Sequence, residues 1–145
     1  MKASEILKVK GPEVYTIGED KTLFNAADVM VSNRIGMLLV LNSDAKMAGV
    51  LSERDLVRVA HKMPESWHSQ HVKDHMTKKV IVCEADDELD YVENIMTNNH
   101  IRHLPVLSNK RLIGLISIGD IVKAQLSEKR TENKYLMDYI SGNVK

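Results

Sequence analysis

"GVLSERDLVR", residues 49–58, has the same pattern as "GLISIGDIVK", residues 114–123. Each stretch has a glycine, two aliphatic residues, a serine, two variable residues, an aspartate, two aliphatic residues and a basic residue. The apolar run predicts a strand. Ser-x-x-Asp is typical of a helix start, where the serine hydroxyl and the carboxylate each accept a bond from a backbone N–H group. The two stretches therefore predict two strand-to-helix junctions of the same design.

The duplication extends upstream of both junctions. Residues 14–43 align with residues 80–109 at an offset of 66, and a one-residue deletion in the second copy then brings the junctions into register at an offset of 65. Identities include Leu23 with Leu89 and Met30 with Met96. A repeat at fixed spacing indicates two copies of one structural unit.

Each copy predicts the order strand, helix, strand, strand, helix. Apolar residues at helical spacing give the first helix of each copy one apolar face. These residues are Leu23, Ala26, Ala27, Met30 and Val31 in the first copy and Leu89, Val92, Ile95 and Met96 in the second. The predicted strands cover 14–17, 37–41 and a run ending at 52, then 80–83, 103–107 and a run ending at 117. The last helices begin at Glu53 and Ile118.

We expect an α/β (α+β) fold in which two pseudo-symmetric β-α-β-β-α units pack as one module. The expected segments are 1–66 for the first repeat with its lead-in, 67–126 for the second repeat and 127–145 for a helical extension. Four residues of the extension share one helix face, and Gly142 is a natural helix stop. The four are Tyr135, Leu136, Tyr139 and Ile140.

Composition narrows the class of protein. The 145 residues contain 20 Lys plus Arg and 20 Asp plus Glu, and a nucleic-acid binder usually needs a clear basic excess. A single cysteine, Cys83, excludes an intrachain disulfide and fits a reducing cytosol. The first residues have no apolar signal segment, and the longest apolar run, 35–41, is too short to span a membrane. We expect a cytoplasmic protein that binds neither nucleic acid nor membranes.

The Ser-x-x-Asp pattern has two interpretations. In the first it is only a capping box that starts a helix. In the second, the N-terminus of the helix and the serine hydroxyl attract a phosphate, while the aspartate one turn later accepts bonds from a vicinal diol. Phosphate at the serine and ribose at the aspartate describe a nucleotide, with the apolar strand as a wall for the base.

The doubled pattern resembles a tandem pair of cystathionine-β-synthase (CBS) domains, also called a Bateman module. The marks of that family are "GVLSERDLV", "GLISIGDIV" and "HLPVL" at 103–107, although "LLV" at 38–40 replaces the usual "LPV" in the first copy. The resemblance covers nearly the whole chain, and the chain is similar to stand-alone bacterial CBS pairs. It implies that aspartate binds ribose, that serine binds phosphate, and that neighbouring strand residues line an adenine pocket.

The resemblance assigns residues to two ligand sites. The first site comprises Thr16, Gly36, Met37, Leu38, Ser52, Arg54 and Asp55. The second comprises Val82, Arg102, His103, Leu104, Pro105, Ser117, Gly119 and Asp120. Because Arg54 and Gly119 occupy the same place in the two motifs, the sites need not be equivalent. Each arginine is either a phosphate ligand or a solvated surface residue.

Other constellations point less clearly to a function. His68, His71 and His75 have helical spacing, but no thiol or acid completes a metal site with them, so no metal is expected. No nucleophile–base pair and no known catalytic motif occurs, so we expect no enzyme and no catalytic cofactor. Cys83 is expected to be a buried, inert thiol.

Three hypotheses follow. The first is a regulatory sensor of energy or redox state that binds AMP, ADP, ATP or NAD(H), with S-adenosylmethionine ranked below them, and changes conformation on binding. It would form a homodimer and act on a separate effector protein. The second is a dimerisation scaffold without ligand. The third, ranked last, is a nucleotide hydrolase.

Overall fold

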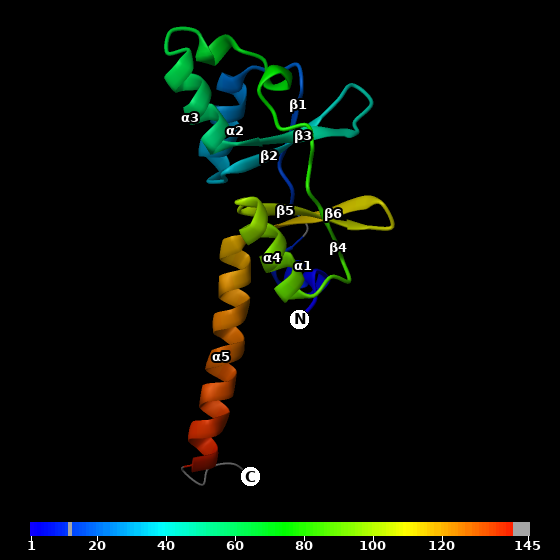
Figure 1. The fold of residues 1–145 in the computed structure, drawn as a ribbon, viewed down its shortest axis with the longest axis vertical. Coiled ribbons are helices and arrows are strands. Elements are labelled where there is room, and N and C mark those ends of the chain that lie inside the picture. The colour runs from blue at the N-terminus through cyan, green and yellow to red at the C-terminus, as the bar shows by residue number, and fades with distance from the viewer. Residues whose placement is uncertain (12, 141–145) are drawn as a thin grey trace. The chain divides into compact units, whose positions relative to one another are not determined.

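The computed structural model describes residues 1–11 and 13–140, and its helices and strands are drawn in Figure 1. The first repeat contains β1 (Thr16–Gly18), α2 (Leu23–Asn33), β2 (Met37–Leu41), β3 (Met47–Ser52) and α3 (Glu53–Lys62). The second contains β4 (Cys83–Glu84), α4 (Leu89–Asn99), β5 (His103–Ser108), β6 (Arg111–Ser117) and α5 (Ile118–Ile140). Helix α1 (Ala3–Lys10) precedes both, and the short helices η1 (Trp67–Ser69) and η2 (Val72–Asp74) lie between them.

Each repeat forms its own three-stranded sheet, in the orders β1-β2-β3 and β4-β5-β6. The outer strand β1 or β4 runs parallel to the central strand, and the hairpin strand β3 or β6 runs antiparallel to it. The predicted order of strands and helices is therefore confirmed in both copies. Among the described residues, no helix combines the length and apolarity that crossing a membrane requires.

The outer strands begin later than predicted, and in the second copy a proline explains the difference. In the first copy the Leu39 amide donates to the Tyr15 carbonyl over 3.1 Å, and β1 pairs with β2 over three residues. The second copy has Pro105 at the place of Leu39, and proline has no N–H group to donate. Strand β4 accordingly has only two residues, and Val82 lies just outside it.

The compact units follow other boundaries than the segments 1–66 and 67–126. One unit contains residues 13–81, and the other contains 1–12 together with 82–145. The lead-in thus packs with the second repeat: the Ala3 amide donates to the Asp87 carbonyl over 2.9 Å. The linker packs with the first repeat, since Thr77 and Val50 exchange backbone bonds of 3.0 and 2.9 Å. Each repeat is completed by the segment that precedes the other.

Both cores are aliphatic, with Met30 and Met96 buried as filler. The predicted inner face of α2 is correct for Leu23, Ala26 and Met30, but it is wrong for Val31, whose exposed fraction is 78%. In the second unit the buried side chains come from α1, α4, β5, β6 and the start of α5. They include Ile6, Leu7, Leu89, Val92, Leu104, Val106, Ile116 and Ile121.

Helix α5 is one continuous helix from Ile118 to Ile140, so the predicted extension is the last part of the motif helix. Leu136, from the predicted apolar face, is 54% exposed. The side chains of Tyr135, Tyr139 and Ile140, and residue Gly142 with the rest of 141–145, lie outside the described residues.

Candidate functional site

The first Ser-x-x-Asp forms the junction between β3 and α3 as a complete capping box. The Asp55 amide donates to Oγ of Ser52 over 3.2 Å, and the Ser52 amide donates to Oδ2 of Asp55 over 2.9 Å. The Ser52 hydroxyl also donates to Oδ2 of Asp55, over 3.1 Å. Asp55 is buried. The carboxylate therefore has a structural role before any ligand is considered.

The second junction, between β6 and α5, repeats the backbone part of this arrangement. The Asp120 amide donates to Oγ of Ser117 over 3.1 Å, and the Ser117 amide donates to Oδ2 of Asp120 over 2.8 Å. The interpretation of Ser-x-x-Asp as a helix cap is therefore correct for both copies. A capping role does not exclude a ligand, because a carboxylate has about four acceptor positions.

Each junction is also fastened to the start of the central strand. The Glu53 amide donates to the Gly36 carbonyl over 2.9 Å, and the Ile118 amide donates to the Arg102 carbonyl over 2.8 Å. In each first turn this leaves one amide, that of Arg54 or Gly119, for which the described residues provide no partner. An anion at either helix start would accept its bond from that amide.

The glycine of each motif lets another segment pack closely against the hairpin: the linker at Gly49, and helix α1 at Gly114. A Cβ at Gly49 would stand 2.6 Å from the carbonyl oxygen of Thr77, and one at Gly114 would stand 2.6 Å from Cδ2 of Leu7. In the first unit a side chain at this place would collide with backbone, and in the second with the end of a side chain. The glycine thus serves the packing of the segment that completes each unit.

A basic side chain pairs with each aspartate, and it comes from a different part of the chain in each copy. In the first copy Nη1 of Arg58, on the same helix, donates to Oδ1 of Asp55 over 3.1 Å. In the second copy Nζ of Lys10, on α1, donates over 2.7 Å to Oδ2 of Asp120 and also to the Leu115 carbonyl. Lys10 was missed at the sequence level because it lies 110 residues from Asp120. Arg58 was overlooked although it ends the quoted motif.

The surroundings of Asp120 change its acidity. Burial raises the pKa of Asp120, but hydrogen bonds from Lys10 and Ser117 together outweigh that effect, so the net pKa lies below its ordinary value. Asp120 is therefore ionised at neutral pH and can accept bonds from hydroxyl groups. Cys83 shows the opposite case: burial, with help from Asp87 and Glu84, raises the pKa of its thiol to about 12. That agrees with a buried, unreactive cysteine.

The structure brings part of the predicted first site together. Met37 pairs with Ser52 across β2 and β3, next to Gly36 and the start of α3. Thr16 is exposed on β1 and pairs with Leu39 on the neighbouring strand. Leu38 is fully buried in the core, so it contributes its backbone to this edge. Arg54 is exposed, and no ion pair to it is found in the described part of the chain.

The predicted second site is arranged in the same way. His103 pairs with Ser117, and Pro105 pairs with Leu115. Leu104 and Pro105 are buried, Val82 is half-buried, and Arg102 is exposed. Gly119 is exposed in the first turn of α5, where an added Cβ would meet nothing closer than Oγ of Ser117 at 3.5 Å. The backbone at Gly119 is therefore open on the side where another residue would carry its side chain.

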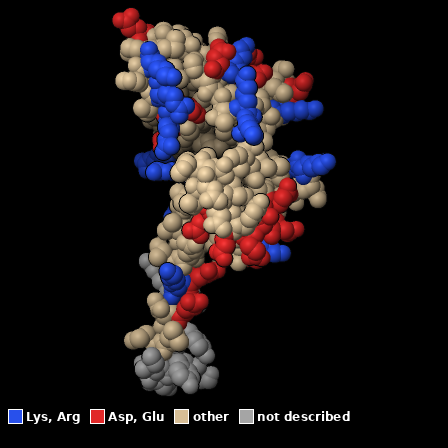
Figure 2. Space-filling view, viewed as in Figure 1, with Lys and Arg blue, Asp and Glu red and all other residues tan. Residues whose placement is uncertain are grey.

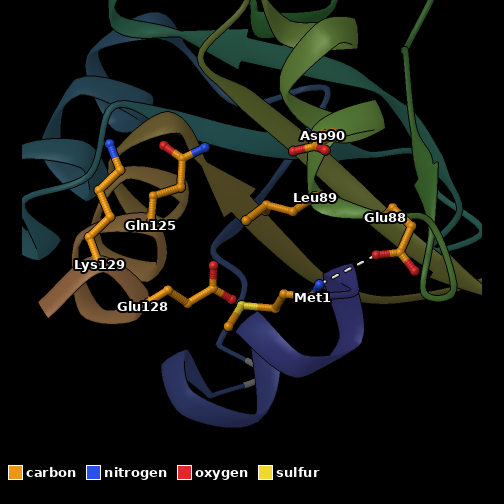
Figure 3. A pocket seen from close by; sticks show the side chains of 7 residues that line it. All are labelled: Met1, Glu88, Leu89, Asp90, Gln125, Glu128 and Lys129. Carbon is orange, nitrogen blue, oxygen red and sulfur yellow. Dashed lines mark hydrogen bonds and ion pairs between the residues drawn. The ribbon is translucent and has the colours of Figure 1, made fainter. Parts of the chain in front are cut away.

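A separate hollow of about 380 Å³ lies in the unit of the second repeat. Figure 3 shows its polar lining from the chain start, α4 and α5, with the Met1 amino group directed at Glu88 over 3.4 Å. It contains none of the predicted site residues. The lining residues are Met1, Glu88, Leu89, Asp90, Gln125, Glu128 and Lys129.

The three linker histidines do not assemble a metal site. Nε2 of His75 lies 3.1 Å from Oε1 of Gln70. Over residues 1–11 and 13–140, no group of three or more His, Cys, Asp or Glu side chains is placed to hold a metal ion. The expectation that no metal is bound stays a prediction.

Comparison with known proteins bears on both copies. A family model described as "CBS domain" matches residues 4–62 and again residues 72–127. The chain is 33% identical over 147 residues to the CBS domain-containing protein CBSX3, mitochondrial, of Arabidopsis thaliana, a match that covers 96% of this chain and 71% of that protein.

Solved structures share the fold over most of its length. A CBS-domain containing protein, ATU1752 from Agrobacterium tumefaciens, is similar with a TM-score of 0.83 and 37% identity, covering 86% of this chain and 92% of that one. The CBS domain pair of protein MJ0100, solved in complex with 5′-methylthioadenosine and S-adenosyl-L-methionine, has a TM-score of 0.76 at 20% identity, over 88% of this chain and 98% of that one.

Proposed function

Because the chain belongs to the CBS domain family, we propose that it is a regulatory module that binds an adenosine-containing ligand at its Ser-x-x-Asp junctions. The observation that carries the proposal is that each junction combines an aspartate with one first-turn amide to which no described residue offers an acceptor. Ribose hydroxyls would donate to Asp55 or Asp120, and a phosphate would accept from the amide of Arg54 or Gly119.

Exposed arginines beside each junction support a phosphate-bearing ligand. Arg54 follows the first cap, and Arg102 precedes β5 beside the second, and both are exposed. Figure 2 shows Lys and Arg side chains prominent over the unit of residues 13–81. A guanidinium group binds phosphate in a bidentate manner, which favours AMP, ADP, ATP or NAD(H) over a ligand without phosphate. S-adenosylmethionine ranks below them.

The base would lie against the strand edge next to the cap. In the first unit we assign the base to Thr16, Gly36, Met37 and Leu38, of which Met37 pairs with the cap residue Ser52. In the second unit we assign it to Val82, Arg102, His103, Leu104 and Pro105, of which His103 pairs with the cap residue Ser117. We propose binding without turnover, because no histidine falls within either Ser-x-x-Asp motif to act as the base that would make its serine a nucleophile. A cytoplasmic location likewise stays a prediction.

We further propose that the module forms a homodimer, which a separate effector protein recognises. Each unit exposes large apolar side chains on its helices: Phe24, Val31 and Val57 on α2 and α3, and Tyr91, Val122 and Leu126 on α4 and α5. Burial of such side chains is the usual driving force for association. Light scattering should give twice the chain mass of 16.4 kDa. One chain mass at micromolar concentration would contradict the dimer.

One observation favours a second function, the ligand-free dimerisation scaffold. Both aspartates already accept capping bonds, and Asp55 is buried with both oxygens occupied. On this account Ser-x-x-Asp exists only to start two helices. The two accounts differ in whether adenosine ligands stabilise the protein.

A melting screen with AMP, ADP, ATP, NADH and S-adenosylmethionine separates the accounts. A ligand at 100 times its dissociation constant should stabilise the fold by roughly 2.7 kcal/mol. A shift with at least one of these ligands, without product on incubation, supports the proposal. No shift with any of them supports the scaffold, and product formation supports the hydrolase.

A further inference from the structure

The two aspartates differ in the oxygen that their cation occupies. At Asp55, Oδ2 takes the capping bonds and Arg58 takes Oδ1, so both oxygens have partners. At Asp120, the Ser117 amide and Lys10 both bind Oδ2. No bond to Oδ1 of Asp120 comes from the described residues. The second junction therefore offers a carboxylate oxygen that the first does not.

Lys10 is held where it lies by the packing of α1. Its Nζ spans two acceptors, Oδ2 of Asp120 and the Leu115 carbonyl, both at 2.7 Å. Leu7, one turn earlier, lies against Gly114 on the strand that leads to Ser117. The Lys10 side chain is 32% exposed, whereas that of Arg58 is 56% exposed. Arg58 is therefore the more readily displaced of the two cations.

We propose that Lys10 is a positioning residue for the Asp120 site, fixing Oδ2 so that Oδ1 receives a ligand hydroxyl, and that Arg58 blocks the Asp55 site until it moves. The proposal rests on the proposed function and deepens it. It ranks the two sites: a ligand that carries a ribose diol binds first at Asp120. It also gives α1, a segment outside the repeat motif, control over that site alone.

The test uses the full chain with AMP as the probe and calorimetric titration as the measurement. The Asp55→Asn background isolates the Asp120 site, and Asp120→Asn isolates the other. In the first background Lys10→Met should weaken AMP binding about tenfold, because Asp120 loses a charge-assisted bond that holds it. Lys10→Arg should restore most of the affinity. Lys8→Met, a change to an exposed lysine of the same helix, is the control and should leave affinity unchanged.

In the Asp120→Asn background Arg58→Met should strengthen AMP binding, because it frees Oδ1 of Asp55. Unchanged affinity in Lys10→Met, or tighter binding there, would overturn the positioning role, and unchanged or weaker binding in Arg58→Met would overturn the blocking role. If Lys10→Met does not fold, Lys10→Gln replaces it in the same titration. If the unmutated chain binds none of the five screened ligands, the proposed function fails and this inference fails with it. If it binds and Lys10 has no effect, only the inference fails.

Discussion

Both repeat units start a helix directly after a hairpin strand with the same cap, but different residues support the cap in each unit. In the first unit the cap and the cation that pairs with it come from one short stretch of sequence: Ser52, Asp55 and Arg58 lie within seven residues. In the second unit the cap is completed by Lys10, from the opposite end of the chain. The repeat motif is thus conserved within the molecule while its supporting contacts are not. That difference can be tested at the glycine, the serine, the lysine and the aspartate.

The largest effect on stability is expected at the motif glycines. Gly49→Ala would drive a Cβ against the Thr77 carbonyl, which two backbone bonds to Val50 hold in place. We expect a loss of about 3 kcal/mol in the free energy of unfolding. Gly114→Ala meets both methyl groups of the buried Leu7 side chain, and because a side chain can shift more readily than backbone, a smaller loss of about 1 kcal/mol is expected.

Urea unfolding of both variants measures this difference. Gly18→Ala is the control, since its Cβ would meet only Cγ of Lys21 at an ordinary 3.7 Å. Equal losses at Gly49 and Gly114 would mean that backbone and side-chain neighbours constrain the two units alike.

A smaller effect is expected at the cap serines. Ser52→Ala and Ser117→Ala each remove the acceptor of a first-turn amide and should lower the free energy of unfolding by about 1 kcal/mol. The larger loss should occur at Ser52, whose hydroxyl also donates to buried Asp55. Thermal unfolding with Ser43→Ala, an exposed hairpin residue, as reference checks the order. A larger loss at Ser117 would contradict it.

A still smaller effect is expected on the pH dependence of stability, through Asp120 and Lys10 in the second unit. The pKa of Asp120 is lowered in the folded state, so its contribution to stability is complete above the ordinary carboxyl pKa and disappears as the pH falls through the lower folded value. Lys10→Met removes the main lowering interaction and should move the acid unfolding midpoint to higher pH. An acid titration of ellipticity beside Lys8→Met tests this, and an unchanged midpoint would show that Lys10 does not hold Asp120.

The features that sequence reasoning predicted are local or repeated. Two copies of one pattern determined the element order, and Ser52 and Ser117 were placed at helix starts because a cap involves residues three apart. Lys10 could not be predicted, because its partner is adjacent only after α1 has packed on β6. For the same reason the sequence did not predict that the lead-in 1–12 packs with the second repeat and the linker 67–81 with the first. The late start of β4 had a readable signal in Pro105, which lacks the amide that a central strand needs.

The central claim is that the aspartates hold a ribose besides capping their helices, and calorimetric titration of Asp55→Asn and Asp120→Asn with AMP tests it most directly. Each change should lower stability by under about 1 kcal/mol, because asparagine keeps a capping oxygen and the ion pairs are partly exposed. Each should also weaken binding at its own site roughly tenfold to a hundredfold and spare the other site. Unchanged affinity in both variants would contradict the claim and leave Ser-x-x-Asp as two helix caps.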